Sequence, residues 1–163
     1  MPFNELMINC IKNGTSHKEH GVSVYAKPRQ GGGETILFFA IDSNSNNCSN
    51  FPGVINTDVI CDLLVYYSTK DSDKKLCLVE LKGSDIKHAV KQIIGTKDRT
   101  ENLLKKRGNY QNINWKALIV HSGSAPRQWK SKKLRTELDS AFGKGNYYMV
   151  HKMKYDLGDF IRN

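Results

Sequence analysis

Two neighbouring apolar segments constrain the fold of this chain more than any other feature. Val59–Tyr67 and Leu76–Lys82 consist mainly of aliphatic and aromatic residues, which favour β-strands. The segment between them, residues 68–74, contains only polar residues and has the composition of a turn. The two segments are therefore predicted to pair as an antiparallel hairpin.

Three charged residues lie within these otherwise apolar strands. Glu80 and Lys82 are two residues apart, so their side chains share one face of the strand. A turn centred near residue 71 places Asp62 opposite Glu80 across the hairpin. Like charges at opposed positions destabilise a sheet, and an unpaired buried carboxylate costs free energy. The pair is therefore expected to have a partner of opposite charge.

A divalent metal ion would remove the repulsion between these two carboxylates. Asp62 and Glu80, with the main-chain carbonyl of Leu81, offer hard oxygen ligands suited to Mg²⁺, with Mn²⁺ as a substitute. Such an ion polarises a phosphate oxygen and lowers the pKa of a bound water molecule. Lys82 could orient that water or stabilise charge on the phosphate. The pattern predicts a phosphodiester-cleaving site with Asp62, Glu80 and Lys82 as its catalytic residues.

The rest of the chain is predicted to form one α/β domain over residues 1–163 with a mixed sheet. Ser84 is expected to cap a helix whose apolar positions recur at helical spacing, and Gly95 leaves open whether that helix continues. The other expected elements are helices at Asn4–Ile11 and Lys130–Phe142 and strands at Val22–Ala26, Thr35–Ile41, Trp115–Val120 and Tyr147–Met153.

The charge of the chain is concentrated in its second half. Residues 1–80 carry 7 basic and 9 acidic side chains, whereas residues 81–163 carry 18 basic and 7 acidic ones. This asymmetry favours a polyanionic partner, with nucleic acid ahead of an anionic membrane. The residues expected to contact nucleic acid are basic positions on the two helices that follow the hairpin: Lys87, Lys91, Lys130, Lys132, Lys133 and Arg135.

The apolar runs and the cysteines bear on location. The longest apolar run is six residues, around Ile36–Ile41, far short of the roughly 20 that cross a bilayer. The N-terminus lacks the pattern of a secretory signal. The four cysteines form no CxxC pair and are expected to be reduced, mostly structural thiols. These features predict a cytoplasmic protein without a membrane partner.

The segment from Cys61-Asp62 through Val79-Glu80-Leu81-Lys82 to Gln92 resembles the core of the PD-(D/E)XK nuclease superfamily. The resemblance implies a restriction-endonuclease-like α-β-β-β-α-β core. It also implies that Asp62 and Glu80 bind the metal and that Lys82 is the catalytic lysine. Cys61 stands where many members have proline, and Gln92 is followed by Thr96 rather than the tyrosine of some branches. Glu5 on the first helix and Gln92 are possible accessory residues.

We therefore expect a Mg²⁺-dependent endonuclease that acts on nucleic acid, with DNA ahead of RNA. Two alternatives remain at this stage. A non-catalytic nucleic-acid-binding module, for example a subunit of a restriction, repair or defence complex, would share the basic half. A protein-binding accessory factor would use that surface for solubility. Cutting both strands requires two sites, so a homodimer is possible. The recognised sequence or structure is not predictable from the chain.

Overall fold

A computed structural model of the protein describes residues 10–42, 60–70, 74–82, 84–106, 113–123 and 131–163. These residues form a mixed α/β fold with two mixed sheets and three helices, which confirms the predicted α/β class but divides the strands between two sheets, where one was predicted. The larger sheet has the order β3-β4-β5-β6-β7. Its strands are β3 (Thr35–Ala40), β4 (Leu63–Ser68), β5 (Lys74–Lys82), β6 (Ile113–His121) and β7 (Tyr147–His151).

The larger sheet changes direction at its central strand. The pairs β3–β4 and β4–β5 are antiparallel, whereas the pairs β5–β6 and β6–β7 are parallel. The predicted hairpin is therefore the β4–β5 pair, in which Leu63 lies opposite Val79. A parallel strand must be reached by a crossover. Helix α2 (Ile86–Lys106) provides it between β5 and β6, and α3 (Lys132–Phe142) provides it between β6 and β7.

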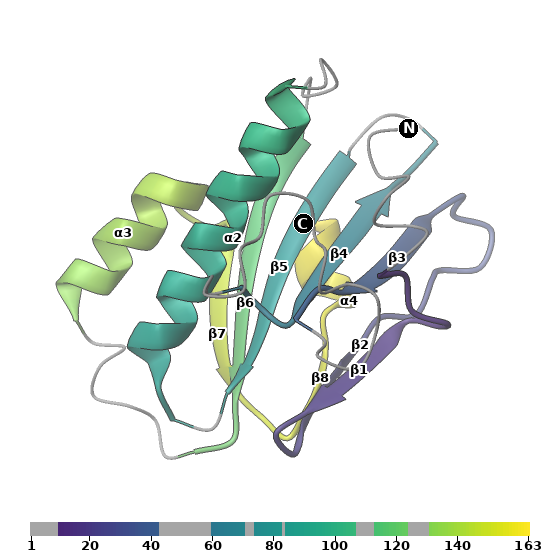
Figure 1. Ribbon diagram of the computed structural model, residues 1–163. Helices are drawn as coiled ribbons and strands as arrows, with labels where there is room; N and C mark the ends of the chain where they lie inside the picture. Colours follow the sequence, from purple (N-terminus) through teal and green to yellow (C-terminus); the bar gives the residue numbers. More distant parts are fainter. Residues whose placement is uncertain (1–9, 43–59, 71–73, 83, 107–112, 124–130) are drawn as a thin grey trace.

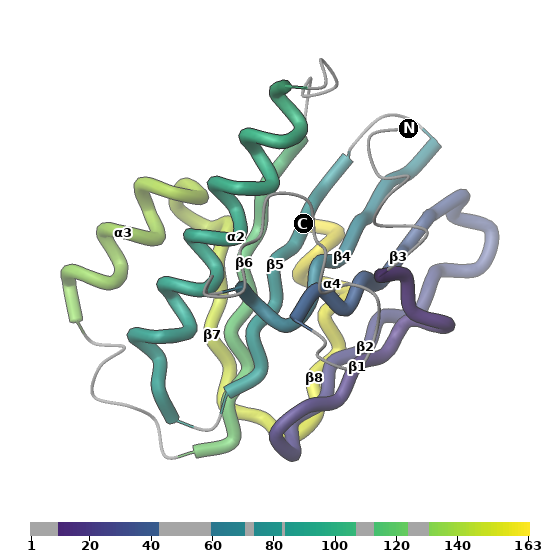
Figure 2. Tube along the Cα trace, in the orientation of Figure 1, coloured from purple at the N-terminus to yellow at the C-terminus, as the bar shows by residue number. Residues whose placement is uncertain are grey.

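The two faces of the sheet are covered by different elements (Figures 1 and 2). Helices α2 and α3 lie side by side on one face, where Ile93 and Leu138 pack with alternate strand residues such as Leu78. The opposite face packs against the smaller sheet and α4 (Gly158–Arg162), through Val24 and Ile161. Because β5 is apolar on both faces, it is buried at every position from Lys75 to Leu81, as expected for a strand between two layers.

The N-cap of helix α2 lies one residue later than predicted. The side chain of Asp85, not Ser84, accepts a hydrogen bond from the backbone N–H of His88 at 3.0 Å, which is the N-cap interaction. The helix continues through Gly95 without a break because its apolar residues remain on the buried side beyond that point, as at Leu104.

Of the smaller sheet the sequence analysis predicted only β2, as the strand Val22–Ala26, and it missed β1, β8 and α4. β1 (Ser16–Glu19) pairs antiparallel with β2 (Val22–Tyr25), and β2 pairs parallel with β8 (Lys154–Asp156). The predicted last strand over Tyr147–Met153 is therefore wrong at its end. β7 stops at His151, and the chain crosses to the smaller sheet after Met153, whose carbonyl accepts the N–H of Ser23.

The N-terminal prediction can be compared only at its end. Residues 4–9 of the predicted helix Asn4–Ile11 lie outside the described residues. Ile11 is not helical but forms an isolated bridge to Phe39.

The cysteines correct one expectation and support another. Cys61 and Cys77 are free and buried, as predicted for core thiols. Cys10 is disulfide-bonded, so the prediction that all four cysteines are reduced is wrong. Structural disulfides persist mainly in oxidising compartments, and cytoplasmic location accordingly stays a prediction. No helix in the described ranges combines the length and apolar character needed to traverse a bilayer.

Candidate functional site

Asp62, Glu80 and Lys82 meet at one end of the β4–β5 pair. Asp62 directly precedes β4, and Glu80 and Lys82 are in the last three residues of β5. The register of the pair, Leu63 opposite Val79, places Asp62 opposite Glu80 when it is continued by one step. The predicted juxtaposition of the two carboxylates is therefore confirmed.

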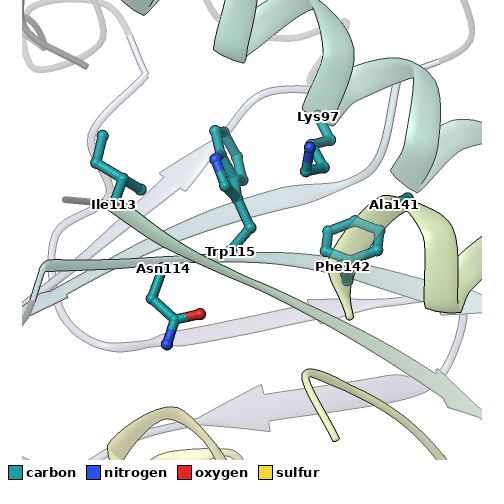
Figure 3. Close-up of a pocket in the computed structure, with 6 residues that line it drawn as sticks. All are labelled: Lys97, Ile113, Asn114, Trp115, Ala141 and Phe142. Atoms are coloured by element: carbon teal, nitrogen blue, oxygen red, sulfur yellow. The ribbon is translucent and has the colours of Figure 1, made fainter. Parts of the chain in front are cut away.

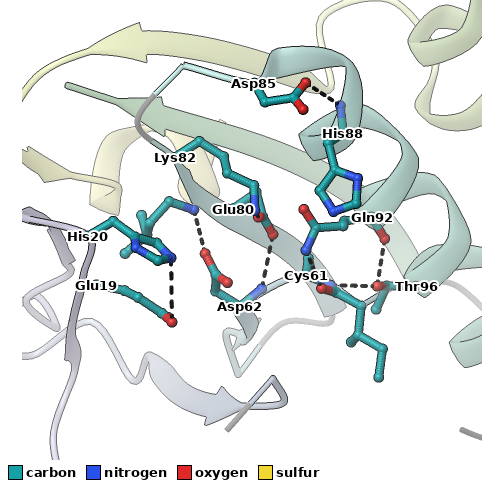
Figure 4. Close-up of polar contacts among 12 residues, drawn as sticks. Glu19, His20, Cys61, Asp62, Glu80, Lys82, Asp85, His88, Gln92 and Thr96 are labelled. Atoms are coloured by element: carbon teal, nitrogen blue, oxygen red, sulfur yellow. Dashed lines mark hydrogen bonds and ion pairs between the residues drawn. The ribbon is translucent and has the colours of Figure 1, made fainter. Parts of the chain in front are cut away.

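Backbone N–H groups of the two strands donate hydrogen bonds to the two neighbouring carboxylates (Figure 4). The N–H of Asp62 donates to Oε2 of Glu80 at 3.2 Å. The N–H of Leu81 donates to Oδ2 of Asp62 at 2.7 Å. Each carboxylate thus accepts a hydrogen bond from the strand that carries the other, which holds the two groups together.

Lys82 supplies the positive charge at this site. Its Nζ lies 2.8 Å from Oε1 of Glu80, and the side chains are 19% and 0% exposed, respectively. The contact is a close ion pair between the ammonium group and the buried Oε1. Each oxygen of Glu80 thus has a partner, Lys82 for Oε1 and the N–H of Asp62 for Oε2.

Burial makes both carboxyl groups hard to ionise. Loss of solvent raises the pKa of Asp62 to about 7, against the opposing hydrogen bond from Leu81. Burial, followed by the charge of Asp62, raises the pKa of Glu80 to about 8. Burial alone would lower the pKa of Lys82, but the contact with Glu80 outweighs it and the pKa is raised. Carboxyl pKa values shifted this far are found preferentially at functional sites.

The chain before Asp62 is held by helix α2. Gln92 Nε2 donates to the carbonyl of Ile60 at 2.7 Å, and Thr96 Oγ1 accepts the N–H of Cys61 at 2.9 Å. The predicted accessory residue Gln92 therefore supports the backbone that carries Asp62. Its Oε1 is buried and without a hydrogen-bond partner in the described ranges.

The carbonyl of Leu81 also points toward this site. In a β-strand the N–H and C=O of one residue point to the same side, since paired residues exchange both bonds. The N–H of Leu81 binds Asp62, so the carbonyl of Leu81 is directed to the same side. This orientation is the one required of the predicted third oxygen ligand.

Two further carboxylates, which the sequence analysis missed, influence the site. The charges of Glu19 and Asp42 both raise the pKa of Asp62. Glu19 ends β1, and Asp42 follows β3, whose pairing with β4 continues through a bond from Ile41 N–H to the Asp62 carbonyl at 3.1 Å. Asp42 could have been found by pairing the strand at Thr35–Ile41 with the hairpin. Glu19 carried no such signal because β1 belongs to the other sheet.

The predicted nucleic-acid contacts lie on α2 and α3. Lys87 and Lys91 are exposed in the first two turns of α2, and Lys132, Lys133 and Arg135 are exposed near the start of α3. Both helices begin at the end of the sheet where β5 and β6 terminate (Figure 1). These residues are therefore on the same side of the molecule as Lys82. The remaining candidates, Glu5 and Lys130, lie outside the described residues.

A pocket of about 460 Å³ lies elsewhere, between α2, α3 and the start of β6 (Figure 3). Lys97 lies over the rings of Trp115 and Phe142 there and forms an ion pair with Glu101 at 2.7 Å. Trp115 is near the opposite end of β6 from His121. The pocket is therefore separate from the carboxylate site, and its lysine already has a partner.

The ligand set suits a hard metal ion bound partly by non-protein oxygens. In the part of the chain that the structure describes, no cluster of three or more histidine, cysteine, aspartate or glutamate side chains is arranged to hold a metal. Mg²⁺ is commonly bound through one or two carboxylates, with water and substrate phosphate completing its shell. Asp62, Glu80 and the Leu81 carbonyl fit that pattern. Comparisons with protein-family models, curated proteins and solved structures find no match to this chain.

Proposed function

We propose that this protein is a Mg²⁺-dependent endonuclease that hydrolyses phosphodiester bonds of DNA. The observation that carries the proposal is the buried contact of Asp62, Glu80 and Lys82, which brings two carboxyl groups and one ammonium group together. Two carboxyl groups with raised pKa values, side by side, are an unfavourable arrangement for a purely structural role. A cation between them would stabilise their ionised forms.

In this proposal Asp62 and Glu80 hold the metal together with the Leu81 carbonyl. A metal held there would supply Lewis acidity toward the phosphate and lower the pKa of a bound water molecule. Lys82 stays near Glu80 and places its ammonium group where negative charge develops on the phosphate. The exposed lysines of α2 and α3 contact the sugar-phosphate backbone on either side. Mn²⁺ is expected to replace Mg²⁺.

A second candidate function rests on the same ion pair. Lys82 already neutralises one oxygen of Glu80, so the chain could bind nucleic acid without cleaving it, alone or within a larger complex. This module would bind in a salt-dependent manner, because phosphate contacts release counterions. It would show no turnover with any metal. Cytoplasmic location and a homodimer that cuts both strands are further parts of the proposal.

The test is a cleavage panel of supercoiled plasmid, linear duplex, single strand, four-way junction and RNA with Mg²⁺, Mn²⁺ or EDTA. We expect metal-dependent cleavage that Asp62→Asn and Glu80→Gln abolish. Lys82→Met should slow cleavage by about 10²- to 10³-fold, as for loss of one charge-stabilising donor. Equal cleavage by all variants would contradict the proposal and indicate a contaminating nuclease.

Lys97→Met is the matched control for Lys82→Met. Lys97 forms an ion pair of similar length and burial with Glu101, at 2.7 Å and with side chains 12% and 17% exposed, away from the carboxylate site. Its loss should leave cleavage unchanged. Salt-sensitive binding by the wild type without cleavage of any substrate would favour the binding module.

A further inference from the structure

A pair of stacked histidines lies in the same row of the sheet as Lys82. The parallel register places Lys82 beside His121, and His121 beside His151. The rings of His121 and His151 are stacked, with centroids 5.0 Å apart and planes inclined by 19°. That separation is close to the spacing of neighbouring strands. The stack therefore runs across the strands, from the proposed active site toward the edge of the sheet.

Backbone carbonyl groups fix the orientation of both rings. His121 Nδ1 lies 3.2 Å from the carbonyl of Gly123, and His151 Nε2 lies 3.1 Å from the carbonyl of Ser122. A carbonyl oxygen only accepts hydrogen bonds, so each of these nitrogens carries the proton. Neither ring can rotate without losing its bond.

The outer end of the stack is open. His121 is buried, whereas His151 is exposed. β7, which carries His151, is an edge strand: no strand pairs with its outer side in the described ranges. The next position along the stack is therefore not filled by a further strand. A planar group placed there would continue the series Lys82, His121, His151 at regular strand spacing.

We propose that the outer face of the His151 ring is a stacking site for a nucleobase of the substrate strand. Histidine is one of the side chains on which unstacked bases are placed by proteins that bind single-stranded nucleic acid. Three strand spacings put this base about 14 Å from the row position of Lys82. The site deepens the proposed nuclease function and rests on it, because it assigns the contact to a nucleotide that flanks the bond at Lys82.

Two substitutions separate stacking from the other properties of His151. His151→Phe keeps an aromatic ring but loses the bond to Ser122, whereas His151→Asn keeps a polar group but loses the ring. Lys152→Gln is the control for charge, since Lys152 is exposed and adjacent in sequence. Its ammonium group lies over Tyr155, which packs against the opposite face of the sheet.

The experiment measures binding of single-stranded oligodeoxynucleotides carrying 2-aminopurine at successive positions. EDTA prevents cleavage, and all variants are compared at the same pH. Fluorescence quenching reports stacking of the labelled base, and anisotropy reports affinity. For the wild type and His151→Phe we expect quenching at one position. For His151→Asn we expect that quenching to be lost and affinity to fall about 5- to 100-fold, the usual effect of losing one stacked base.

Equal binding and quenching in the wild type and His151→Asn would overturn the stacking site. Loss in His151→Phe but not in His151→Asn would overturn it as well and assign the role to the bond with Ser122. No binding by the wild type at low salt would also overturn it. Cleavage is measured separately, so a chain that stacks a base but cuts no substrate would refute the nuclease proposal and leave this site intact.

Discussion

Glu34 and Glu80 are two glutamates that are almost withdrawn from solvent, yet their pKa values move in opposite directions. Their side chains are 5% and 0% exposed. The pKa of Glu34 is lowered to about 2, first by its hydrogen bonds with Arg162, whereas burial raises the pKa of Glu80 to about 8. Lack of exposure alone therefore does not determine the protonation state of a carboxyl group in this fold.

The difference lies in the number and geometry of the donors. Glu34 accepts two hydrogen bonds from the Arg162 guanidinium at 2.8 and 3.0 Å, one from the Tyr67 hydroxyl and one from the Arg29 N–H. Both oxygens of Glu34 are thus satisfied. Glu80 has one backbone donor and the ammonium group of Lys82. We call Glu34 with Arg162 the clasp, since it joins α4 to the start of β3. The Glu34 carboxylate of the clasp thus has four donors, whereas the Glu80 carboxylate of the site has two.

Replacing the positively charged partner of each glutamate should give the largest change in the free energy of unfolding, and that change should differ most between the two regions. Arg162→Met leaves Glu34 charged and without its main partner, so we expect a loss of about 3–5 kcal/mol in the free energy of unfolding. Lys82→Met should cost less than about 1 kcal/mol at pH 6, where the raised pKa values keep both site carboxyl groups largely protonated. Urea denaturation of both variants at pH 6 measures this. Equal losses would contradict the comparison.

The pH dependence of stability should follow the site and not the clasp. Between pH 4 and 8 the folded site binds more protons than the unfolded chain, because its carboxyl pKa values are raised to about 7 and 8. The contribution of the site to stability must then fall as pH rises. We expect a decrease on the order of 2 kcal/mol from pH 5.5 to 8.5 in EDTA, since relaxation and water entry reduce the full effect of the shifts.

Glu80→Gln should flatten this profile, whereas Arg162→Met should shift it without changing its slope. The reason is that the lowered pKa of Glu34 makes its stabilisation complete above its ordinary pKa and lost only as pH falls toward 2. Thermal melts of the three proteins across the range provide the measurement. A wild-type profile that rises with pH would show that the site carboxyl groups ionise readily.

Metal binding should give the smallest of the three effects. At pH 8 and ten times its Kd, Mg²⁺ should stabilise the wild type by about 1.4 kcal/mol, by mass action on the folded state. This corresponds to a rise of a few degrees in Tm. Glu80→Gln should show no rise, and Glu34→Gln, although less stable, should show the full one. A rise in Glu80→Gln would place the metal elsewhere.

The carboxylate site was predictable because its determinants are local. Asp62 and Glu80 interrupt two consecutive apolar strands, and the polar turn between them sets a register that the β4–β5 pair has. Helix α2 was predictable for the same reason, since Ile86, Val90 and Ile93 repeat at helical spacing. Its cap was placed one residue early, because Ser84 and Asp85 are both good capping residues and the spacing alone does not distinguish them.

The clasp and most of the smaller sheet were not predictable in this way. Glu34 and Arg162 are 128 positions apart, and each alone resembles an ordinary surface charge. β2 was predicted within Val22–Ala26, but β1 has four residues and β8 has three, which is too short to give a strong periodic pattern. The stacked histidines required the order of β5, β6 and β7 across the sheet, which single-strand patterns do not contain.

The attachment of α2 to the residues before Asp62 has a consequence for how this protein can change during evolution. Ile60 contributes only its carbonyl to the bonds with α2, and Cys61 contributes its N–H and a contact of its thiol with Thr96, whereas Gln92 and Thr96 contribute side chains. Position 60 can therefore exchange among apolar residues without disturbing Asp62. Positions 92 and 96 accept only side chains that reach and hydrogen-bond a backbone group. We therefore expect amino-acid substitutions to accumulate more readily in the segment before Asp62 than at positions 92 and 96 of α2.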